Sequence, residues 1–145
     1  MGKNKMRKTA YILIVLILIL LVLIFIRKLR TEKLEAIKII AGNEEFYLKN
    51  LSKIEMQEIK TKSEDKFSAA SIQKILESFE IHEKKFIRIT FISGDGAGIS
   101  FKKDKIPQLF LVQQKEKKQR EFRLIVPDDE FKQRWLKNIK YIELR

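Results

Sequence analysis

The longest hydrophobic stretch of the chain runs from Tyr11 to Ile26, with Leu16 and Leu21 in its interior. It holds no charged residue, and basic residues flank it on both sides. At about 1.5 Å per residue, roughly 17 to 20 helical residues cover about 26 to 30 Å, close to the hydrocarbon thickness of a bilayer. A helix also satisfies its own backbone hydrogen bonds in lipid. The pattern therefore predicts one transmembrane helix over residues 10–27, with the lipid bilayer as its partner.

Two other interpretations of this stretch compete with a transmembrane helix. A cleaved signal peptide ends in small residues, whereas this stretch ends in Phe25-Ile26-Arg27-Lys28. A buried core helix that is apolar on every face would be unusually long for so small a domain. Four Lys or Arg residues precede the stretch and four follow it, so the positive-inside rule does not set the orientation. The short amino-terminal tail, residues 1–9, favours a signal-anchor with the following domain outside the cytoplasm.

A different hydrophobic pattern follows the basic tether of residues 28–35 and predicts one α+β domain over residues 36–145. Short segments of large apolar and β-branched residues, several of them alternating with polar ones, predict strands. These segments are 36–41, 45–48, 58–61, 86–92, 99–101, 108–113, 121–126 and 139–144. Helical spacing of Ile72, Ile75, Leu76 and Phe79 predicts a helix over 68–79 with Ser68 as its N-cap. Shorter helices are expected over 51–56 and 128–135. Many strands with one clear helix indicate a mixed sheet and not a doubly wound fold.

The net charge of +12 adds less to this picture than its size suggests. Residues 1–33 hold eight Lys or Arg and one Glu, so more than half of the excess flanks the membrane segment. In the domain, lysines alternate with glutamates as on an ordinary solvated surface. We therefore expect no nucleic-acid partner. The chain has no cysteine, which excludes disulfides, thiolate nucleophiles and cysteine-ligated metals.

The order of four segments resembles the molybdopterin-binding domain of the sulfite-oxidase-like oxidoreductases, in a short form that covers nearly all of residues 45–144. Leu48-Lys49-Asn50-Leu51 with Ile54 is similar to that family's lead-in, and Phe67 to Leu76 to its aromatic-led helix. The other two segments are Ile89 to Ile99, with its central Gly94-Asp95-Gly96, and Phe122-Arg123-Leu124-Ile125-Val126-Pro127 followed by Trp135, Lys137-Asn138-Ile139 and Ile142-Glu143. The resemblance implies the fold. Each motif alone is weak, and their order carries the resemblance.

The chemistry of that family does not carry over in the same way. Its enzymes bind molybdenum through a cysteine thiolate, and this chain has Lys62-Ser63-Glu64-Asp65-Lys66 in the matching region. A soft thiolate is not readily replaced by serine or carboxylate. We therefore expect no molybdenum cofactor, and the leading hypothesis is a membrane-anchored, non-catalytic binding or accessory module that binds a small ligand or a partner in a membrane protein complex.

Two alternatives stay open. One is a diverged oxidoreductase subunit that keeps a pterin or another redox cofactor, with Arg88, Lys102 and Arg123 as its anion contacts. The other is a structural membrane protein with an unrelated α+β domain.

The most tempting candidate site is the loop formed by Gly94, Asp95, Gly96, Ala97 and Gly98. Its backbone amides could form an anion-binding nest, although Asp-Gly is also a common hairpin turn and the favoured interpretation here. The single histidine, His82, is interpreted as a surface residue, and Asp128-Asp129-Glu130 as helix capping and not a cation site. Trp135 is expected in the core. No catalytic set and no metal site are predicted.

Overall fold

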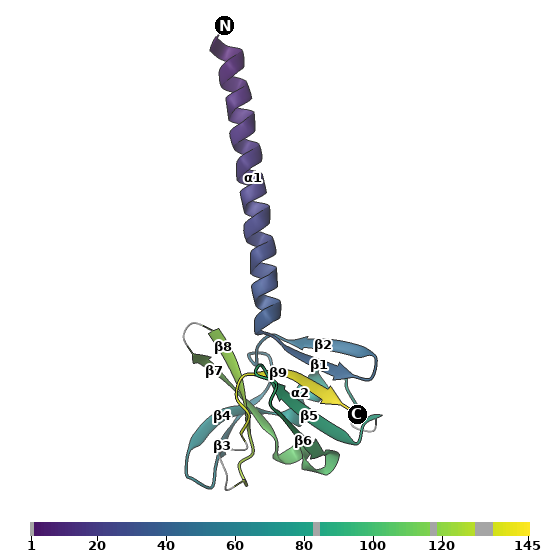
Figure 1. Ribbon diagram of the computed structural model, residues 1–145. Coiled ribbons are helices and arrows are strands. Elements are labelled where there is room, and N and C mark those ends of the chain that lie inside the picture. Colours follow the sequence, from purple (N-terminus) through teal and green to yellow (C-terminus); the bar gives the residue numbers. More distant parts are fainter. Residues whose placement is uncertain (1, 83–84, 117–118, 130–134) are drawn as a thin grey trace. The chain divides into compact units, whose positions relative to one another are not determined.

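The computed structural model, shown in Figure 1, describes residues 2–82, 85–116, 119–129 and 135–145. The chain divides into two compact units, Met1–Leu34 and Glu35–Arg145. The first is almost entirely one helix, and the second is built from two sheets and a short helix. The expected α+β class, with an N-terminal apolar helix followed by mixed-sheet structure, is confirmed.

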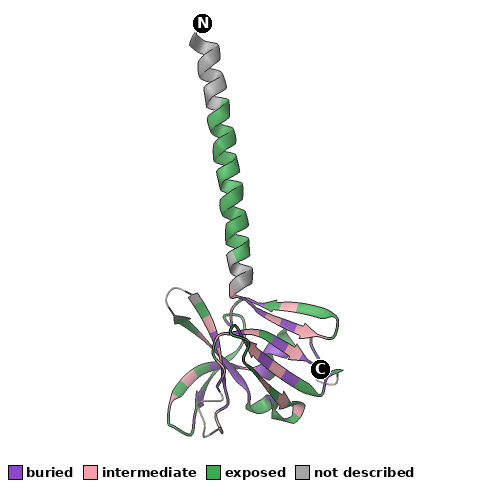
Figure 2. Ribbon diagram, viewed as in Figure 1, coloured by how far each residue is buried: buried purple, intermediate pink, exposed green. Residues whose placement is uncertain are grey.

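Helix α1 extends over Gly2–Glu35, and its segment Tyr11–Arg30 is long and apolar enough to cross a membrane. A signal sequence near the N-terminus meets the same criteria of length and composition. None of the side chains of Tyr11–Arg30 is buried, whereas a helix from a protein core hides most of its apolar surface. Figure 2 shows this exposure along the helix.

The larger sheet of the second unit, sheet A, has the strand order β2-β1-β9-β5-β6. All of its neighbours are antiparallel except β1 and β9, which are parallel. Its strands are β1 Ile37–Ala41, β2 Glu44–Leu48, β5 Arg88–Ser93, β6 Gly98–Lys102 and β9 Ile139–Leu144. The first and last strands of the domain are therefore neighbours.

The smaller sheet, sheet B, is antiparallel throughout and has the order β3-β4-β7-β8. Its strands are β3 Met56–Lys60, β4 Lys66–Ser71, β7 Phe110–Glu116 and β8 Gln119–Ile125. A 3-10 helix, η2, connects the two sheets over Lys103–Gln108, and the sequence pattern had not predicted it.

The period of two along the strands explains where the core lies. In β5, Ile89 and Phe91 are fully buried while their neighbours Arg88 and Thr90 are not. In β9, Ile142 and Leu144 are buried in the same way, and Ile139 is also buried, beyond a shift in register opposite Ile92 and Ser93. Apolar faces of both sheets thus contribute to one hydrophobic cluster, which Figure 2 shows inside the domain. Burial of apolar surface in this cluster is the main stabilising contribution to the domain.

Helix α2 is shorter than predicted and covers Ile72–Ser78. The expected first turn, residues 68–71, belongs to β4, where Ala70 lies opposite Met56 on one side and Leu111 on the other. Ser71, not Ser68, caps the helix, and its hydroxyl accepts a hydrogen bond from the Lys74 amide at 3.2 Å. Ser68 and Ser71 are both suited to an N-cap position. Because residues 68–71 pair with the neighbouring strands, the helix begins only after Ser71.

One further helix prediction needs correction, and another lies mostly outside the described residues. Residues 51–54 form a turn, closed by a 3.0 Å hydrogen bond from the Ile54 amide to the Leu51 carbonyl, and β3 follows at Met56. The helix expected over 128–135 begins as a turn, in which the Asp129 amide donates to Val126. Its residues 130–134 lie outside the described residues.

Candidate functional site

The glycine-rich loop is the turn that joins β5 to β6. The Ser93 amide donates to the Ala97 carbonyl at 2.8 Å, and the Ala97 amide donates to the Asp95 carboxylate at 3.0 Å. This backbone hydrogen bond, with a second from the Ser93 hydroxyl, lowers the pKa of Asp95. Gly96 has a φ of +88°, a conformation that suits glycine. The geometry is that of a closed hairpin turn, and ligand binding at this loop stays a prediction.

The three cations predicted as anion contacts of a cofactor do not lie at this loop. Arg88 and Lys102 face each other across β5 and β6, at the end of the hairpin opposite the turn. Arg123 lies on β8 in the other sheet, with its guanidinium 5.6 Å from the centre of the Trp135 ring. The structure therefore does not assemble the predicted residues into one site.

The remaining single candidates have ordinary structural surroundings. Trp135 is buried, with its ring edge-on to Phe67 at 6.0 Å, as expected of a core residue. His82 is exposed. Asp128 and Asp129 lie in a turn, and Glu130 lies outside the described residues. Across the described part of the chain, His, Asp and Glu side chains form no group of three that could hold a metal ion.

Concave surface gathers instead where the β1–β2 hairpin meets the end of α2. One cavity of about 330 Å³ lies between the hairpin turn and the segment after α2. Its lining residues are Ala41, Gly42, Asn43, Glu44, Glu80, Ile81, Lys85, Phe86 and Leu144. The walls are apolar and the rim carries charges of both signs. This combination is typical of a site that holds an apolar group and orients a polar one.

A second cavity, of about 360 Å³, lies between the end of β2, the turn that follows it and the end of α2. It is lined by Tyr47, Leu48, Lys49, Asn50, Lys53, Ile54, Ser78 and Phe79. A shallower depression of about 500 Å³ contains Glu44, Glu45, Glu80 and His82 together with Phe46 and Phe79. The Phe46 and Phe79 rings contact each other with their centres 5.6 Å apart. We call these three adjoining surfaces the hairpin grooves.

Local backbone geometry positions two residues of the hairpin grooves. The end of α2 is closed by hydrogen bonds from Ile81 to the Leu76 carbonyl and from Glu80 to the Glu77 carbonyl, the pattern of a Schellman cap. This cap places Glu80 at a φ of +57°, where glycine is the usual residue. Gly42, in the β1–β2 turn, has a φ of +61°. Both turns therefore face the 330 Å³ cavity in defined conformations.

An ion pair joins the two strands of the β1–β2 hairpin. Lys38 and Glu45 lie 2.7 Å apart, from Nζ to the carboxylate oxygen. The hydrogen bond from Lys38 lowers the pKa of Glu45, and the same bond raises the pKa of Lys38. Because both groups reach solvent, the pair contributes little stability to the hairpin.

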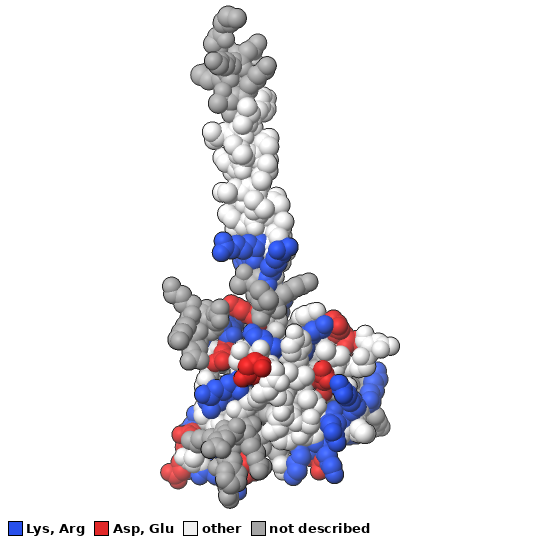
Figure 3. Space-filling model, viewed as in Figure 1, with Lys and Arg blue, Asp and Glu red and all other residues white. Residues whose placement is uncertain are grey.

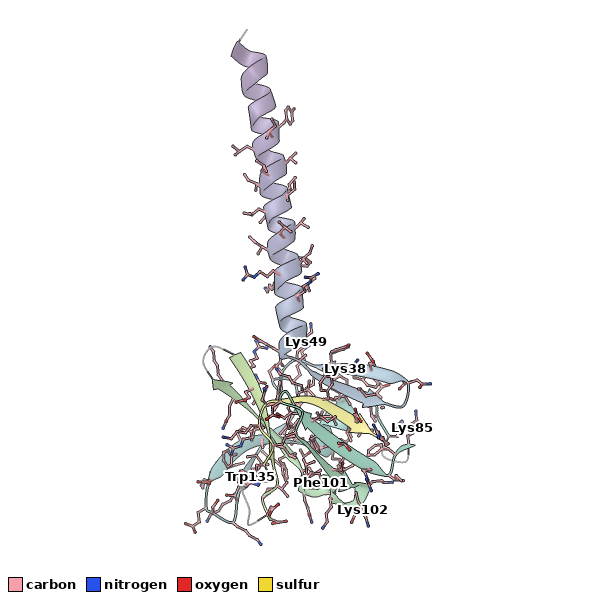
Figure 4. The ribbon with its side chains drawn as sticks, in the orientation of Figure 1. Lys38, Lys49, Lys85, Phe101, Lys102 and Trp135 are labelled. Atoms are coloured by element: carbon pink, nitrogen blue, oxygen red, sulfur yellow. The ribbon has the colours of Figure 1, made fainter. Side chains whose placement is uncertain are left out.

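The hairpin grooves were not predicted from the sequence. Their walls come from segments 41–54 and 78–86, with Leu144 added by the parallel pairing of β9 with β1. The only local signals were the Gly42-Asn43 turn and the end of the α2 periodicity. Figure 4 labels Lys38, Lys49 and Lys85, three cations in this part of the domain. Charged and hydroxyl groups surround apolar surfaces in these grooves, an arrangement that suits a ligand with both polar and apolar parts.

Comparison with known proteins identifies no relative: no family model, no curated protein and no solved structure matches the chain.

Proposed function

We propose that the protein is a single-pass membrane protein whose folded domain, held outside the cytoplasm, is a non-catalytic binding module. The hairpin grooves are its binding site. The observation that carries the proposal is the pair of cavities, about 330 and 360 Å³, at the two ends of strand β2 and next to the Phe46–Phe79 ring pair. Sites for small molecules begin at about 300 Å³, so each cavity suits a small ligand or one side chain of a partner.

The chemistry of the linings narrows the kind of ligand. The 360 Å³ cavity has Leu48, Ile54 and Phe79 as apolar walls, with Lys49 and Lys53 beside the Tyr47 and Ser78 hydroxyls. These groups fit a small carboxylate or phosphate ester that carries an apolar portion, because the lysine ammonium groups donate to its oxygens. The Ser78 hydroxyl itself donates to the Ile75 carbonyl at 2.7 Å. The ligand class we propose is therefore an amphipathic anion.

A thermal-shift measurement on the full-length protein in detergent tests this site. Aromatic and aliphatic carboxylates and phosphate esters are added one at a time, and a ligand at a hundred times its Kd stabilises the folded state by about 2.7 kcal/mol. Ser78→Trp fills the 360 Å³ cavity and should abolish the shift. Ser63→Trp, at an exposed position on the β3–β4 loop, is the matched control and should preserve it. A shift that survives Ser78→Trp, or no shift with any compound, overturns the assignment.

The membrane part of the proposal has its own test. The chain has no cysteine, so a single Ser100→Cys variant carries a unique thiol on exposed strand β6. A membrane-impermeant maleimide should label this thiol in intact cells if the domain lies outside the cytoplasm. Labelling that occurs only after the membrane is permeabilised would show the opposite orientation, with the domain inside the cytoplasm. A mature protein that lacks the first thirty or so residues would identify α1 as a signal sequence instead.

The relation to the molybdopterin-binding fold belongs to the same proposal, and it is supported by the order of the motifs in residues 45–144. Because the chain offers no thiolate, we propose that the relation is one of fold alone. Stoichiometric molybdenum in the purified full-length protein, or a visible absorption band from a pterin or another redox group, would overturn the non-catalytic assignment.

A further inference from the structure

A second surface of the domain lies at the ends of β5, β6 and β9, where β5 begins. Ile87 is 80% exposed, the largest exposed fraction among the large hydrophobic side chains described. Its backbone is nevertheless held on both sides. The Ile87 amide donates to the Arg145 carbonyl at 2.7 Å, and the Lys103 amide donates to the Ile87 carbonyl at 3.0 Å. A rigid backbone thus presents an apolar side chain to solvent.

Several cationic residues are neighbours of this isoleucine along the chain, across the strand pairing or through its backbone hydrogen bonds. The basic corner, as we call it, comprises Ile87 with Lys85, Arg88, Lys102, Lys103, Lys105 and Arg145. Figure 3 shows Lys and Arg side chains gathered at the lower right of the view, where Figure 4 labels Lys85 and Lys102. Asp104 lies within the same segment, and Glu143 is paired with Arg145 at 2.9 Å. The described residues of the corner therefore carry a clear positive excess.

The arrangement of Arg88 and Lys102 distinguishes this corner from the rest of the surface. They are directly opposite each other across two strands, and like charges in that position are destabilising. Among the described residues, no carboxylate forms an ion pair with either of them.

Sheet B has an equivalent pair, Lys60 opposite Lys66 on β3 and β4, and there the repulsion is compensated. Glu64 lies 3.6 Å from Lys60, and Glu58 lies 3.1 Å from Lys66. The same geometry is thus neutralised in one sheet and left positive in the other. An anion supplied from outside would remove the repulsion at the basic corner.

We propose that the basic corner docks on the anionic headgroups of a lipid bilayer, with Ile87 inserted at the headgroup level. Charge complementarity selects an anionic partner, and the exposed isoleucine favours lipid over a polyanion in water, because only a bilayer offers it an apolar environment. The inference rests on the membrane-spanning part of the proposed function, which keeps a bilayer at high effective concentration.

The test uses the full-length protein in nanodiscs and the absence of native cysteines. A nitroxide on Ile87→Cys reports its depth through relative collisions with oxygen and with a water-soluble nickel complex. In phosphatidylcholine–phosphatidylglycerol discs the label should be protected from nickel. In phosphatidylcholine discs, or in about 1 M salt where charges are screened beyond about 3 Å, it should be exposed. A label on Ser63→Cys should stay exposed throughout.

Charge variants make the test specific to the corner. Arg88→Gln with Lys102→Gln should lower the ratio of docked to free domain roughly 25-fold, since each cation near an anionic surface contributes about fivefold. Lys60→Gln with Lys66→Gln removes the same formal charge from an equivalent pair and should leave the ratio unchanged.

Three outcomes overturn the proposal. One is a label at position 87 that is equally exposed in both disc types, and another is an equal response to the two double variants. The third is protection of the label by polyglutamate or duplex DNA but not by anionic discs, which would assign the corner to a soluble polyanion. Protein that fails to remain in either kind of disc would instead count against the transmembrane helix, so the two failures are distinguishable.

Discussion

Helix α1 and the β-sheet domain contain similar hydrophobic side chains and expose them in opposite ways. Between Tyr11 and Ile26 the exposed fraction is 43 to 70%, whereas Ile37 and Ile39 of β1 are 0% exposed. Apolar residues in the domain alternate with polar ones, so one face of each strand can be buried. The apolar residues of α1 occupy every face, and no packing within the described residues covers them. The domain therefore buries its apolar residues within itself, whereas α1 exposes a segment that is long and apolar enough to span a membrane.

The largest expected effect comes from charging the helix. Leu16→Arg with Leu21→Arg should reduce membrane insertion by about 6 kcal/mol, because Arg is about 3 kcal/mol less favourable than Leu near the bilayer centre. The variant should move from the membrane pellet to the soluble fraction after alkaline extraction. Leu16→Phe with Leu21→Phe is the control and should stay in the pellet. A double-arginine protein that resists extraction would show that another part of the molecule anchors it.

The converse change, in the core of the domain, should leave the membrane attachment intact. Phe91 and Phe122 are among the largest fully buried side chains, and truncation of either to Ala should destabilise the domain by about 3 to 5 kcal/mol. Urea unfolding of the full-length protein in detergent, followed by the fluorescence of the single tryptophan, Trp135, measures this loss. Tyr141→Ala, at a 44% exposed position, should have a much smaller effect. Loss of membrane extraction resistance in the Phe91 variant would mean that the two units are not independent.

These two regions also differ in how far their structure follows from local sequence. The apolar helix needs no partner within the protein, and a hydropathy pattern alone predicts it. Strand β5, which alternates strictly, and strand β9 were also predicted closely. In β4, by contrast, Ser68-Ala69-Ala70-Ser71 carries no strand pattern, and pairing with β3 and β7 makes it one.

The hairpin grooves could not be predicted for a related physical reason. Their walls depend on the parallel contact between β1 and β9, which are about a hundred residues apart in the chain. The spacing of residues along the chain does not indicate a contact between segments so far apart. The predicted loop at Gly94–Gly98 was recognised as a turn, because Asp-Gly and the required positive φ at Gly96 are local features.

Close packing at Gly94 offers a smaller, more local test of the domain. A Cβ atom at this position would lie 2.7 Å from the Asn138 side-chain amide. The close atom is the end of the Asn138 side chain, which must leave its rotamer, so Gly94→Ala should destabilise the domain by about 1 kcal/mol without any effect on membrane extraction. Gly98→Ala is the matched control, since its Cβ would meet the nearest atom at 3.6 Å, an ordinary contact.

A compensating variant decides whether that contact is the cause. Adding Asn138→Gly to Gly94→Ala removes the opposing side chain, and glycine accepts the φ of +49° at position 138. Urea unfolding should then show that the double variant recovers the stability that Gly94→Ala loses relative to Asn138→Gly alone. Equal losses in both backgrounds would place the cause in the backbone of the turn.

The smallest expected effect concerns pH and again separates the two units. Hydrogen bonds from the Ala97 amide and the Ser93 hydroxyl favour the charged form of Asp95 and lower its pKa. A depressed carboxyl pKa contributes stability that is present above the unfolded-state pKa and is lost as the pH falls through the folded-state value. NMR titration of the Asp95 carboxyl should give a pKa below the ordinary value of about 3.9, and Ser93→Ala should raise it. The apolar stretch from Ile12 to Ile26 holds no ionisable group, so acid should weaken the domain while α1 stays in the membrane. Release of the whole protein from the bilayer in the same acid range would contradict this separation of the two units.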